Sequence, residues 1–195
     1  LGLGIHGLRH IISPTAGYSY TNSSVMPATD PRFGGGASIG SGAVSLVLSN
    51  KLQTKRNGQQ SVDLVDFRIT SSYSVKPESS EKRGSSLSDL LFELDLLPYS
   101  WLRVNADATY KHTDRYSENF GHISSINYDI NFDFGPERYI GIGQRYERKG
   151  SNELTYSASW RLNPKWRLAF YHVRNMGHTL TKTRGLREQE YTISR

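Results

Sequence analysis

The chain has 195 residues, no cysteine and a formal net charge of +6; 36% of its residues are hydrophobic and 22% are charged. This length supports one domain of ordinary size, and the lack of cysteine excludes disulfides and thiolate metal sites within the sequence. No apolar run reaches the roughly 18 residues that a transmembrane helix needs. The Lys and Arg residues are scattered and form no basic helix, so we do not expect nucleic-acid binding.

About ten β-strands and no helix are predicted along the chain. We expect strands at 9–20, 43–55, 62–75, 89–96, 102–111, 123–134, 138–148, 154–162, from 166 onwards, and from 186 to 195. Pro14 lies inside the first of these strands, and a strand tolerates proline only at a sheet edge or a bulge. The first strand is therefore expected to be an edge strand or to carry a bulge.

The strand at 123–134 has the strictest pattern in the sequence. Its apolar residues alternate with polar ones over about ten positions, which predicts a β-strand with one apolar and one polar face. A strand in a soluble core usually follows this alternation for only about five or six residues. Ten residues is roughly the length with which a tilted strand crosses a bilayer, so the pattern favours a wall between lipid and water.

The predicted connections alternate between tight and long. The tight connections lie near Asn57-Gly58, Pro98-Tyr99-Ser100, Gly135-Pro136 and Asn163-Pro164. The connections between them are longer and polar, at 21–41, 76–86, 112–120 and 177–185. The exception is 149–152, which is short although it alternates with the tight connections. This asymmetry is typical of outer-membrane β-barrels. Aromatic residues near strand ends fit the interfacial girdles of such barrels: Tyr99, Trp101, Tyr110, Tyr139, Tyr146, Trp160 and Trp166. The alternative is a soluble antiparallel sandwich, in which the same apolar residues form a core.

The alternation divides the predicted strands into two sets of side chains. In a barrel, the residues facing the lumen would be Asp66, Arg68, Glu93, Asp95, Arg103, Asp107, Lys111, Asp129, Asp133 and Arg161. The residues facing lipid would be Phe67, Ile69, Leu94, Val104, Ile126, Tyr128, Ile130, Phe132, Tyr156, Trp160, Leu168 and Phe170. The mixed sign of the first set argues against a strongly ion-selective pore and suits passage of a polar amphiphile or a protein plug.

No residue pattern points to catalysis, a metal or a cofactor. The six histidines lack the His-x-x-x-His spacing of a helical metal site, and Gly141-x-Gly143 does not precede a helix. Glycines in the first and seventh predicted strands are expected at bends or places of close packing. We therefore expect no enzyme, although an outer-membrane lipase with a Ser-His pair on its strands stays open.

Three stretches share their order and spacing with a known family. They are 8–14 followed by Tyr18-Ser19-Tyr20; 48–55 followed by 64–73; and 88–98 followed by the strand-rich part up to Trp166 and 186–191. In these stretches, which together span most of the chain, the sequence resembles the C-terminal β-barrel domain of the lipopolysaccharide assembly family LptD, also called OstA or Imp. The resemblance implies that 1–195 is a single barrel segment truncated at both ends, with 21–41 and 76–86 as long loops.

The expected fold is therefore all-β: an antiparallel transmembrane β-barrel, of which this chain supplies about ten strands. The resemblance implies insertion of lipopolysaccharide into the outer leaflet of the outer membrane of a Gram-negative-type bacterium. It also implies a plug lipoprotein similar to LptE as a partner, and periplasmic bridge proteins that bind through an N-terminal domain missing here. A general outer-membrane porin and a soluble all-β binding protein are the two alternatives.

Overall fold

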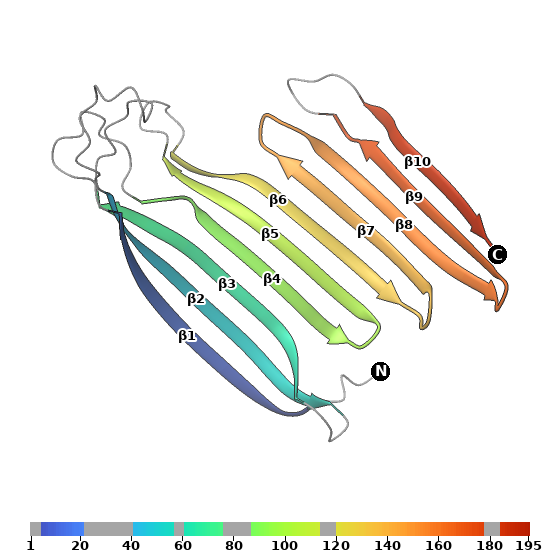
Figure 1. Ribbon diagram of the computed structural model, residues 1–195, viewed down its shortest axis with the longest axis horizontal. Helices are drawn as coiled ribbons and strands as arrows, with labels where there is room; N and C mark the ends of the chain where they lie inside the picture. The colour runs from blue at the N-terminus through green and yellow to red at the C-terminus, as the bar shows by residue number, and fades with distance from the viewer. Residues whose placement is uncertain (1–4, 22–40, 57–60, 76–86, 114–119, 178–183) are drawn as a thin grey trace, which may run out of the picture.

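The computed structural model describes residues 5–21, 41–56, 61–75, 87–113, 120–177 and 184–195. These residues form ten β-strands in one antiparallel sheet, in the order of the sequence (Figure 1). The strands are β1 Ile5–Thr21, β2 Ser41–Arg56, β3 Ser61–Val75, β4 Leu90–Tyr99, β5 Leu102–Thr113, β6 Phe120–Asp133, β7 Arg138–Glu147, β8 Asn152–Asn163, β9 Trp166–Asn175 and β10 Gly185–Ser194. The all-β class is confirmed. Among the described residues, no helix is long and apolar enough to cross a membrane.

Within the described residues the sheet is open, and β1 and β10 form its two edges. Pro14 lies on the edge strand β1, in register with Leu48 of β2, where only one of its two sides has a neighbour. A residue without an N–H group is tolerated there because it interrupts no central ladder. Gly7 marks a shift of register between His6 and Leu8 and has a φ of 74°, which glycine adopts without strain. The edge position predicted from Pro14 is confirmed, whereas the bulge of this strand lies at Gly7 and not at Pro14.

Two predicted connections differ from the structure. Pro98 and Tyr99 belong to β4, and the turn itself is formed by Ser100 and Trp101. Proline cannot donate a ladder hydrogen bond, and the register shifts between Leu96 and Tyr99 accordingly. The predicted loop at 112–120 is shorter than expected, because β5 continues to Thr113 and β6 begins at Phe120. The Asn57-Gly58 hairpin and most of the predicted loops at 21–41 and 76–86 lie outside the described residues.

The alternation of the connections between the two ends of the sheet is confirmed. The ends joined by 57–60, 100–101, 134–137 and 164–165 lie together, and we call this side the turn end. The other side, joined by 22–40, 76–89, 114–119, 148–151 and 176–184, is called the loop end (Figure 1). Consecutive antiparallel strands fix this arrangement, since each connection must return the chain to the opposite end.

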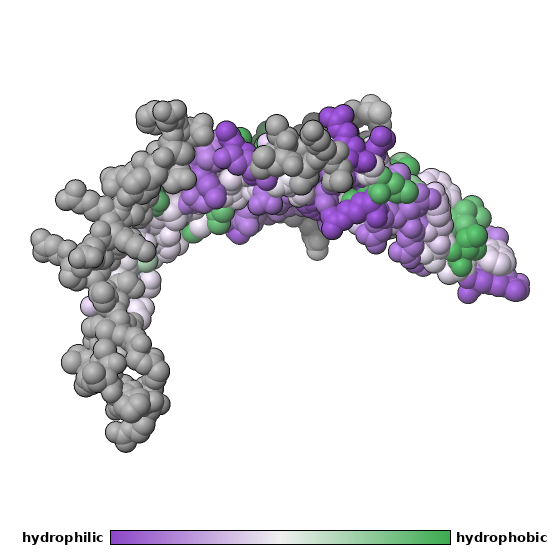
Figure 2. Space-filling model, turned by 90° about the horizontal axis from the view of Figure 1, so that it is seen from above, coloured by the Kyte–Doolittle hydropathy of each residue, from purple (hydrophilic) through white to green (hydrophobic). Residues whose placement is uncertain are grey.

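The sheet is a single curved layer. Viewed from above, it bends into an arch (Figure 2). Among the described residues, Leu64 and Val173 are the only large hydrophobic side chains that are buried, and both keep a few per cent of their surface exposed. A sheet normally buries one face against a second layer of structure. These strands build no such layer for themselves, so whatever covers their apolar side chains must come from outside the sheet.

Two glycines of β7 sit where strands pack most closely. A Cβ atom on Gly141 would lie 2.6 Å from Ser157 Oγ and 2.9 Å from Asn131 Oδ1. A Cβ atom on Gly143 would overlap Asp129 Oδ1 and lie 3.2 Å from the carbonyl oxygen of Tyr128. Close packing, one of the two roles expected for these glycines, is therefore confirmed.

Candidate functional site

The register places the predicted charged residues on one face of the sheet, which we call the polar face. All ten of them share it: Asp66, Arg68, Glu93, Asp95, Arg103, Asp107, Lys111, Asp129, Asp133 and Arg161. The opposite face, called the apolar face, carries all twelve residues predicted to meet lipid: Phe67, Ile69, Leu94, Val104, Ile126, Tyr128, Ile130, Phe132, Tyr156, Trp160, Leu168 and Phe170. Successive side chains of a strand point to opposite faces, so one register fixes both sets.

Two rows of charged and amide side chains cross β3 to β6 on the polar face. The register aligns them as Asp66–Asp95–Asn105–Asp129 and as Arg68–Glu93–Asp107–Asn127. Like charges directly opposite one another destabilise a sheet. In these rows an amide separates Asp95 from Asp129, and Arg68 lies beside Glu93. Asp66 still lies directly opposite Asp95, and Glu93 directly opposite Asp107.

Ion pairs neutralise the outer members of these rows. Lys51 Nζ lies 2.8 Å from Asp66 Oδ2 and 3.3 Å from Asp63 Oδ2. Arg145 lies 2.5 Å from Asp129 Oδ2. Lys51 lies well inside β2, on the polar face between Ser49 and Gln53. Its cation meets Asp66, directly opposite on β3, and Asp63 next to it on the same face.

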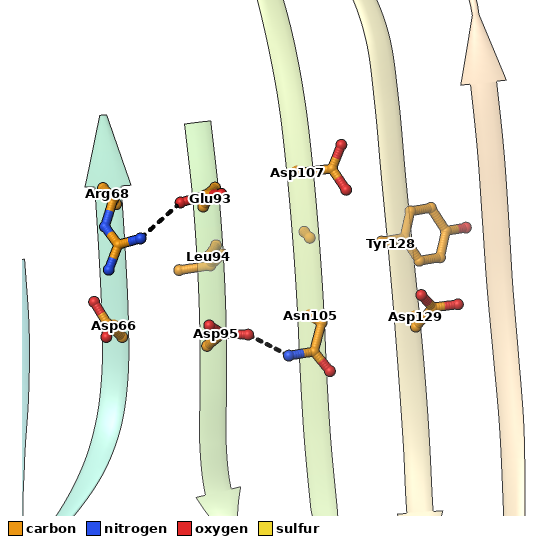
Figure 3. A pocket seen from close by; sticks show the side chains of 10 residues that line it. Asp66, Arg68, Glu93, Leu94, Asp95, Asn105, Asp107, Tyr128 and Asp129 are labelled. Atoms are coloured by element: carbon orange, nitrogen blue, oxygen red, sulfur yellow. Dashed lines mark hydrogen bonds and ion pairs between the residues drawn. The ribbon is translucent and has the colours of Figure 1, made fainter. Parts of the chain in front are cut away.

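A shallow groove of about 280 Å³ runs across these rows (Figure 3), and we call it the polar groove. Its side chains include one guanidinium and five carboxylates: Arg68, Asp66, Glu93, Asp95, Asp107 and Asp129. Arg68 Nη1 lies 3.2 Å from Glu93 Oε2, Asn105 donates to Asp95, and Asn127 donates to Asp107 Oδ2 over 2.8 Å. Asp95 and Asp107 thus have amide partners in place of cations, and the floor of the groove keeps a negative surplus.

The predicted set divides into four places on the polar face. Six of the ten residues line the polar groove, as given above. Arg103 and Asp133 line a neighbouring groove of about 330 Å³ toward the turn end. Lys111 pairs in register with His122 at the loop end, and Arg161 lies in a separate polar network at the turn end.

Sequence reasoning missed several polar side chains that complete this face. Asn105, Asn127 and Gln53 each donate to a carboxylate, the last to Asp63 over 2.6 Å. Arg187 pairs with Glu153 across β8 to β10 although its own strand carries a bulge between Leu186 and Glu188. Alternation alone identifies the face of an amide, but it gives no sign of which carboxylate the amide will bind.

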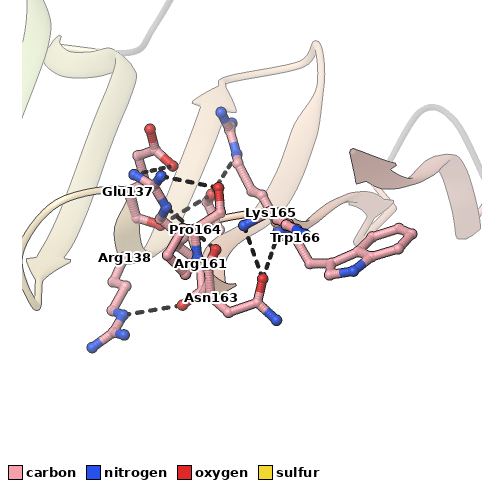
Figure 4. A network of polar contacts seen from close by, with 9 residues as sticks. Glu137, Arg138, Arg161, Asn163, Pro164, Lys165 and Trp166 are labelled. Carbon is pink, nitrogen blue, oxygen red and sulfur yellow. Dashed lines mark hydrogen bonds and ion pairs between the residues drawn. The ribbon is translucent and has the colours of Figure 1, made fainter. Parts of the chain in front are cut away.

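Arg161 belongs to a network that fixes the β8–β9 turn (Figure 4). It lies 3.5 Å from Glu137 Oε2 and donates to the carbonyl oxygens of Asn163 and Pro164. Asn163 Oδ1 accepts hydrogen bonds from the backbone N–H groups of Lys165 and Trp166, at 2.9 and 3.0 Å. An Asn side chain that bonds the backbone two and three residues on is a common device of tight turns.

The apolar face is exposed along most of the sheet. Its large side chains with more than a third of their surface accessible include Leu46, Leu48, Tyr73, Ile140, Trp160, Leu162, Leu168, Tyr191 and Ile193. A typical monomeric soluble protein rarely shows a contiguous apolar patch larger than a few hundred Å². An exposed apolar face of this extent is typical of a surface that binds another protein or a membrane.

Aromatic side chains frame the apolar face at both ends. The turn-end girdle consists of Tyr99, Trp101, Phe132, Phe134, Trp160 and Trp166; in it the rings of Tyr99 and Trp101 stack 4.9 Å apart, and those of Trp101 and Phe132 6.3 Å apart. The loop-end girdle consists of Tyr18, Tyr73, Tyr110 and Tyr146. Tyr139, which was predicted to belong to a girdle, lies instead on the polar face between Asp133 and Ser159.

In the part of the chain that the structure describes, no group of three or more His, Asp or Glu side chains is arranged to hold a metal ion. Comparison of the chain with protein-family models, with curated proteins and with solved structures finds no match. The candidate site thus consists of two faces: a polar face that carries both charges, and an apolar face framed by aromatic rings.

Proposed function

We propose that this chain forms part of the wall of a transmembrane β-barrel in the outer membrane of a Gram-negative-type bacterium, in a protein that inserts lipopolysaccharide into the outer leaflet. The observation that carries the proposal is the exposed apolar face between two aromatic girdles, on a single-layer sheet without a core of its own. Lipid would cover that face, and the polar face would line a hydrated interior. This is the arrangement of outer-membrane barrels in general.

The height of the apolar face supports a bilayer crossing. Trp101 and Tyr110, one from each girdle, are nine residues apart at β5. At about 3.3 Å per residue this separation is roughly 30 Å along the strand. With the strand tilt of about 40° usual in such barrels, the height is ~23 Å, close to the roughly 25 Å of their apolar band.

The connections support an orientation. Short turns face the periplasm and longer loops the cell exterior in bacterial outer-membrane barrels. The turn end of this sheet would then be periplasmic and its loop end extracellular. The charged rows of the polar face would contact water, the polar head of an amphiphile, or a plug.

Lipopolysaccharide insertion rests on the resemblance of 8–20, 48–73 and 88–191 to the LptD family. Under this proposal the partners are lipopolysaccharide, a plug lipoprotein similar to LptE against the polar face, and periplasmic bridge proteins bound by an N-terminal domain. A negatively charged groove with paired cations beside it suits a protein plug, because both signs are available for ion pairs. The protein would act as a transporter without catalysing a reaction.

The test is depletion of the full-length protein that contains this chain. Lipopolysaccharide at the cell surface should fall while its total amount is maintained, and a lipoprotein should co-purify with the barrel. Unchanged surface lipopolysaccharide after depletion would contradict lipopolysaccharide insertion and would favour a general porin. The proposal of a barrel would be unaffected by that result.

A further inference from the structure

A groove lies on the apolar face at the turn end, between β8, β9 and β10. Its volume is about 280 Å³, and the apolar-face side chains along it are Ala158, Trp160, Leu168, Phe170, Tyr191 and Ile193. The rings of Phe170 and Tyr191 lie 5.4 Å apart. A groove of this lining binds a hydrocarbon chain better than a polar group, because it offers side-chain surface that is almost wholly apolar.

Two arginines lie near the turn end of this groove, each over a different tryptophan ring of the β8–β9 hairpin. Arg138, on β7, lies with its guanidinium carbon 5.7 Å from the ring centre of Trp160 on β8. Arg195, directly after β10, lies 5.6 Å from the ring centre of Trp166 on β9. Both therefore lean over the β8–β9 hairpin, and both are on the apolar face by register and alternation. A guanidinium seated on an indole ring keeps its N–H edge available for an anion.

The surrounding charge favours an anion at this place. Arg138 donates its Nε–H to the carbonyl oxygen of Arg161, and among the described residues no carboxylate accepts its terminal N–H groups. Glu137, the acidic residue that precedes Arg138 in the sequence, is paired with Arg161 at 3.5 Å. On the apolar face of β7 to β10, none of the described residues is acidic. Two positive charges are thus left beside the mouth of an apolar groove.

We propose that this groove binds one acyl chain of an anionic diacyl phospholipid, with the lipid phosphate held by Arg138 and Arg195. The inference rests on the proposed function, which places the apolar face in lipid and the turn end on the periplasmic side. That side faces the inner leaflet, so the occupant is a phospholipid of the phosphatidylglycerol class. The bound lipid would cover the apolar groove and neutralise the two cations together.

The experiment uses the full-length protein that contains this chain, with the photoreactive residue p-benzoylphenylalanine in place of Phe170. The protein is reconstituted in vesicles of equal parts phosphatidylglycerol and phosphatidylcholine, irradiated, and its lipid adducts are identified by mass spectrometry. Adducts of phosphatidylglycerol should exceed those of phosphatidylcholine about 25-fold, since each of the two cations changes the affinity for an anionic lipid about fivefold. The double variant Arg138→Gln with Arg195→Gln should bring the ratio near one.

Two controls separate the outcomes. Arg174→Gln removes a positive charge from the same face of β9 at the loop end, and should leave the ratio unchanged. The probe at Phe67, on the apolar face of β3, should form adducts with both lipids without preference. Three results would overturn the inference without contradicting the proposed barrel wall. The first is equal adducts of both lipids at Phe170, and the second is a preference that survives the double variant. The third is a stronger preference for lipopolysaccharide when it is added to the vesicles. Absence of any lipid adduct at both Phe170 and Phe67 would contradict the proposed function itself.

Discussion

Val104 and Asn105 are consecutive residues of β5 whose side chains lie on opposite faces of the sheet. Val104 is in register with Leu96 and Ile130 on the apolar face, whereas Asn105 lies between Asp95 and Asp129 on the polar face. Both are close to the midpoint between the two girdles. A pair of substitutions here therefore tests the two faces at one depth.

We expect Val104→Arg in the full-length protein to reduce the free energy of unfolding by about 2 to 4 kcal/mol, because the charge would sit near the bilayer midplane. Asn105→Arg should change it by no more than about 1 kcal/mol, since the new cation meets water and the two neighbouring carboxylates. Denaturant titration of both variants in lipid vesicles gives the comparison. Equal losses at the two positions would contradict the assignment of the faces.

Gly143 shows how closely the polar face is packed. The Asp129 carboxylate, which pairs with Arg145 at 2.5 Å, occupies the space that a side chain at Gly143 would need. Gly143→Ala should cost about 1 to 3 kcal/mol of stability, as overpacking usually does. In a background with Asp129→Ala this cost should largely disappear, and a double-mutant cycle measures the difference. Costs that simply add would show that the backbone, rather than Asp129, limits the space.

At the scale of the strands, the sequence predicted the elements well where period and turn chemistry agree. The ten strands of the sheet, the alternation of their connections and the membership of both faces follow from a period of two, which neighbouring strands in antiparallel register cannot break. Pro98 misled the prediction because proline usually ends a strand, and the structure instead accommodates it next to a register shift in β4. Tyr139 was misplaced since nearness to a strand end says nothing of the face on which a ring lies.

The groups in the candidate site were harder to predict than the strands that carry them. Alternation placed Asp66, Asp95 and Asp129 on one face, but pairing across strands depends on register, which follows from turn and bulge positions along the whole chain. Asp66 lies directly opposite Lys51, but the contact of Lys51 with Asp63 depends on the bulge between Leu52 and Gln53, which brings Asp63 to the same face. No local sequence pattern predicts that bulge.

The orientation of the hairpins can be tested with two matched cysteine variants. Ser100 lies in the β4–β5 connection at the turn end, and Ser151 in the β7–β8 connection at the loop end. A membrane-impermeant thiol reagent added to intact cells should label Ser151→Cys and spare Ser100→Cys until the outer membrane is opened, since short turns face the periplasm. Labelling of Ser100→Cys alone would invert the topology.

At the scale of the whole molecule, the charge of the polar face bears on what would fill the interior of the proposed barrel. The polar groove offers five carboxylates, with Lys51, Arg68 and Arg145 as their counter-charges nearby. In planar bilayers, the full-length protein with its natural partner should therefore show little steady conductance. A stable, strongly ion-selective open pore in that complex would instead support the porin alternative.

The central claim is that one face of this sheet meets lipid and the other meets water. Nitroxide labels placed singly at 126 to 132 along β6, in the full-length protein in vesicles, test it at every residue of one strand. Accessibility to oxygen, which concentrates in the bilayer, should be high at Ile126, Tyr128, Ile130 and Phe132, and accessibility to a water-soluble nickel chelate should be high at Asn127, Asp129 and Asn131. High accessibility to the nickel chelate at all seven positions, or exclusion of oxygen from the first set, would contradict the claim.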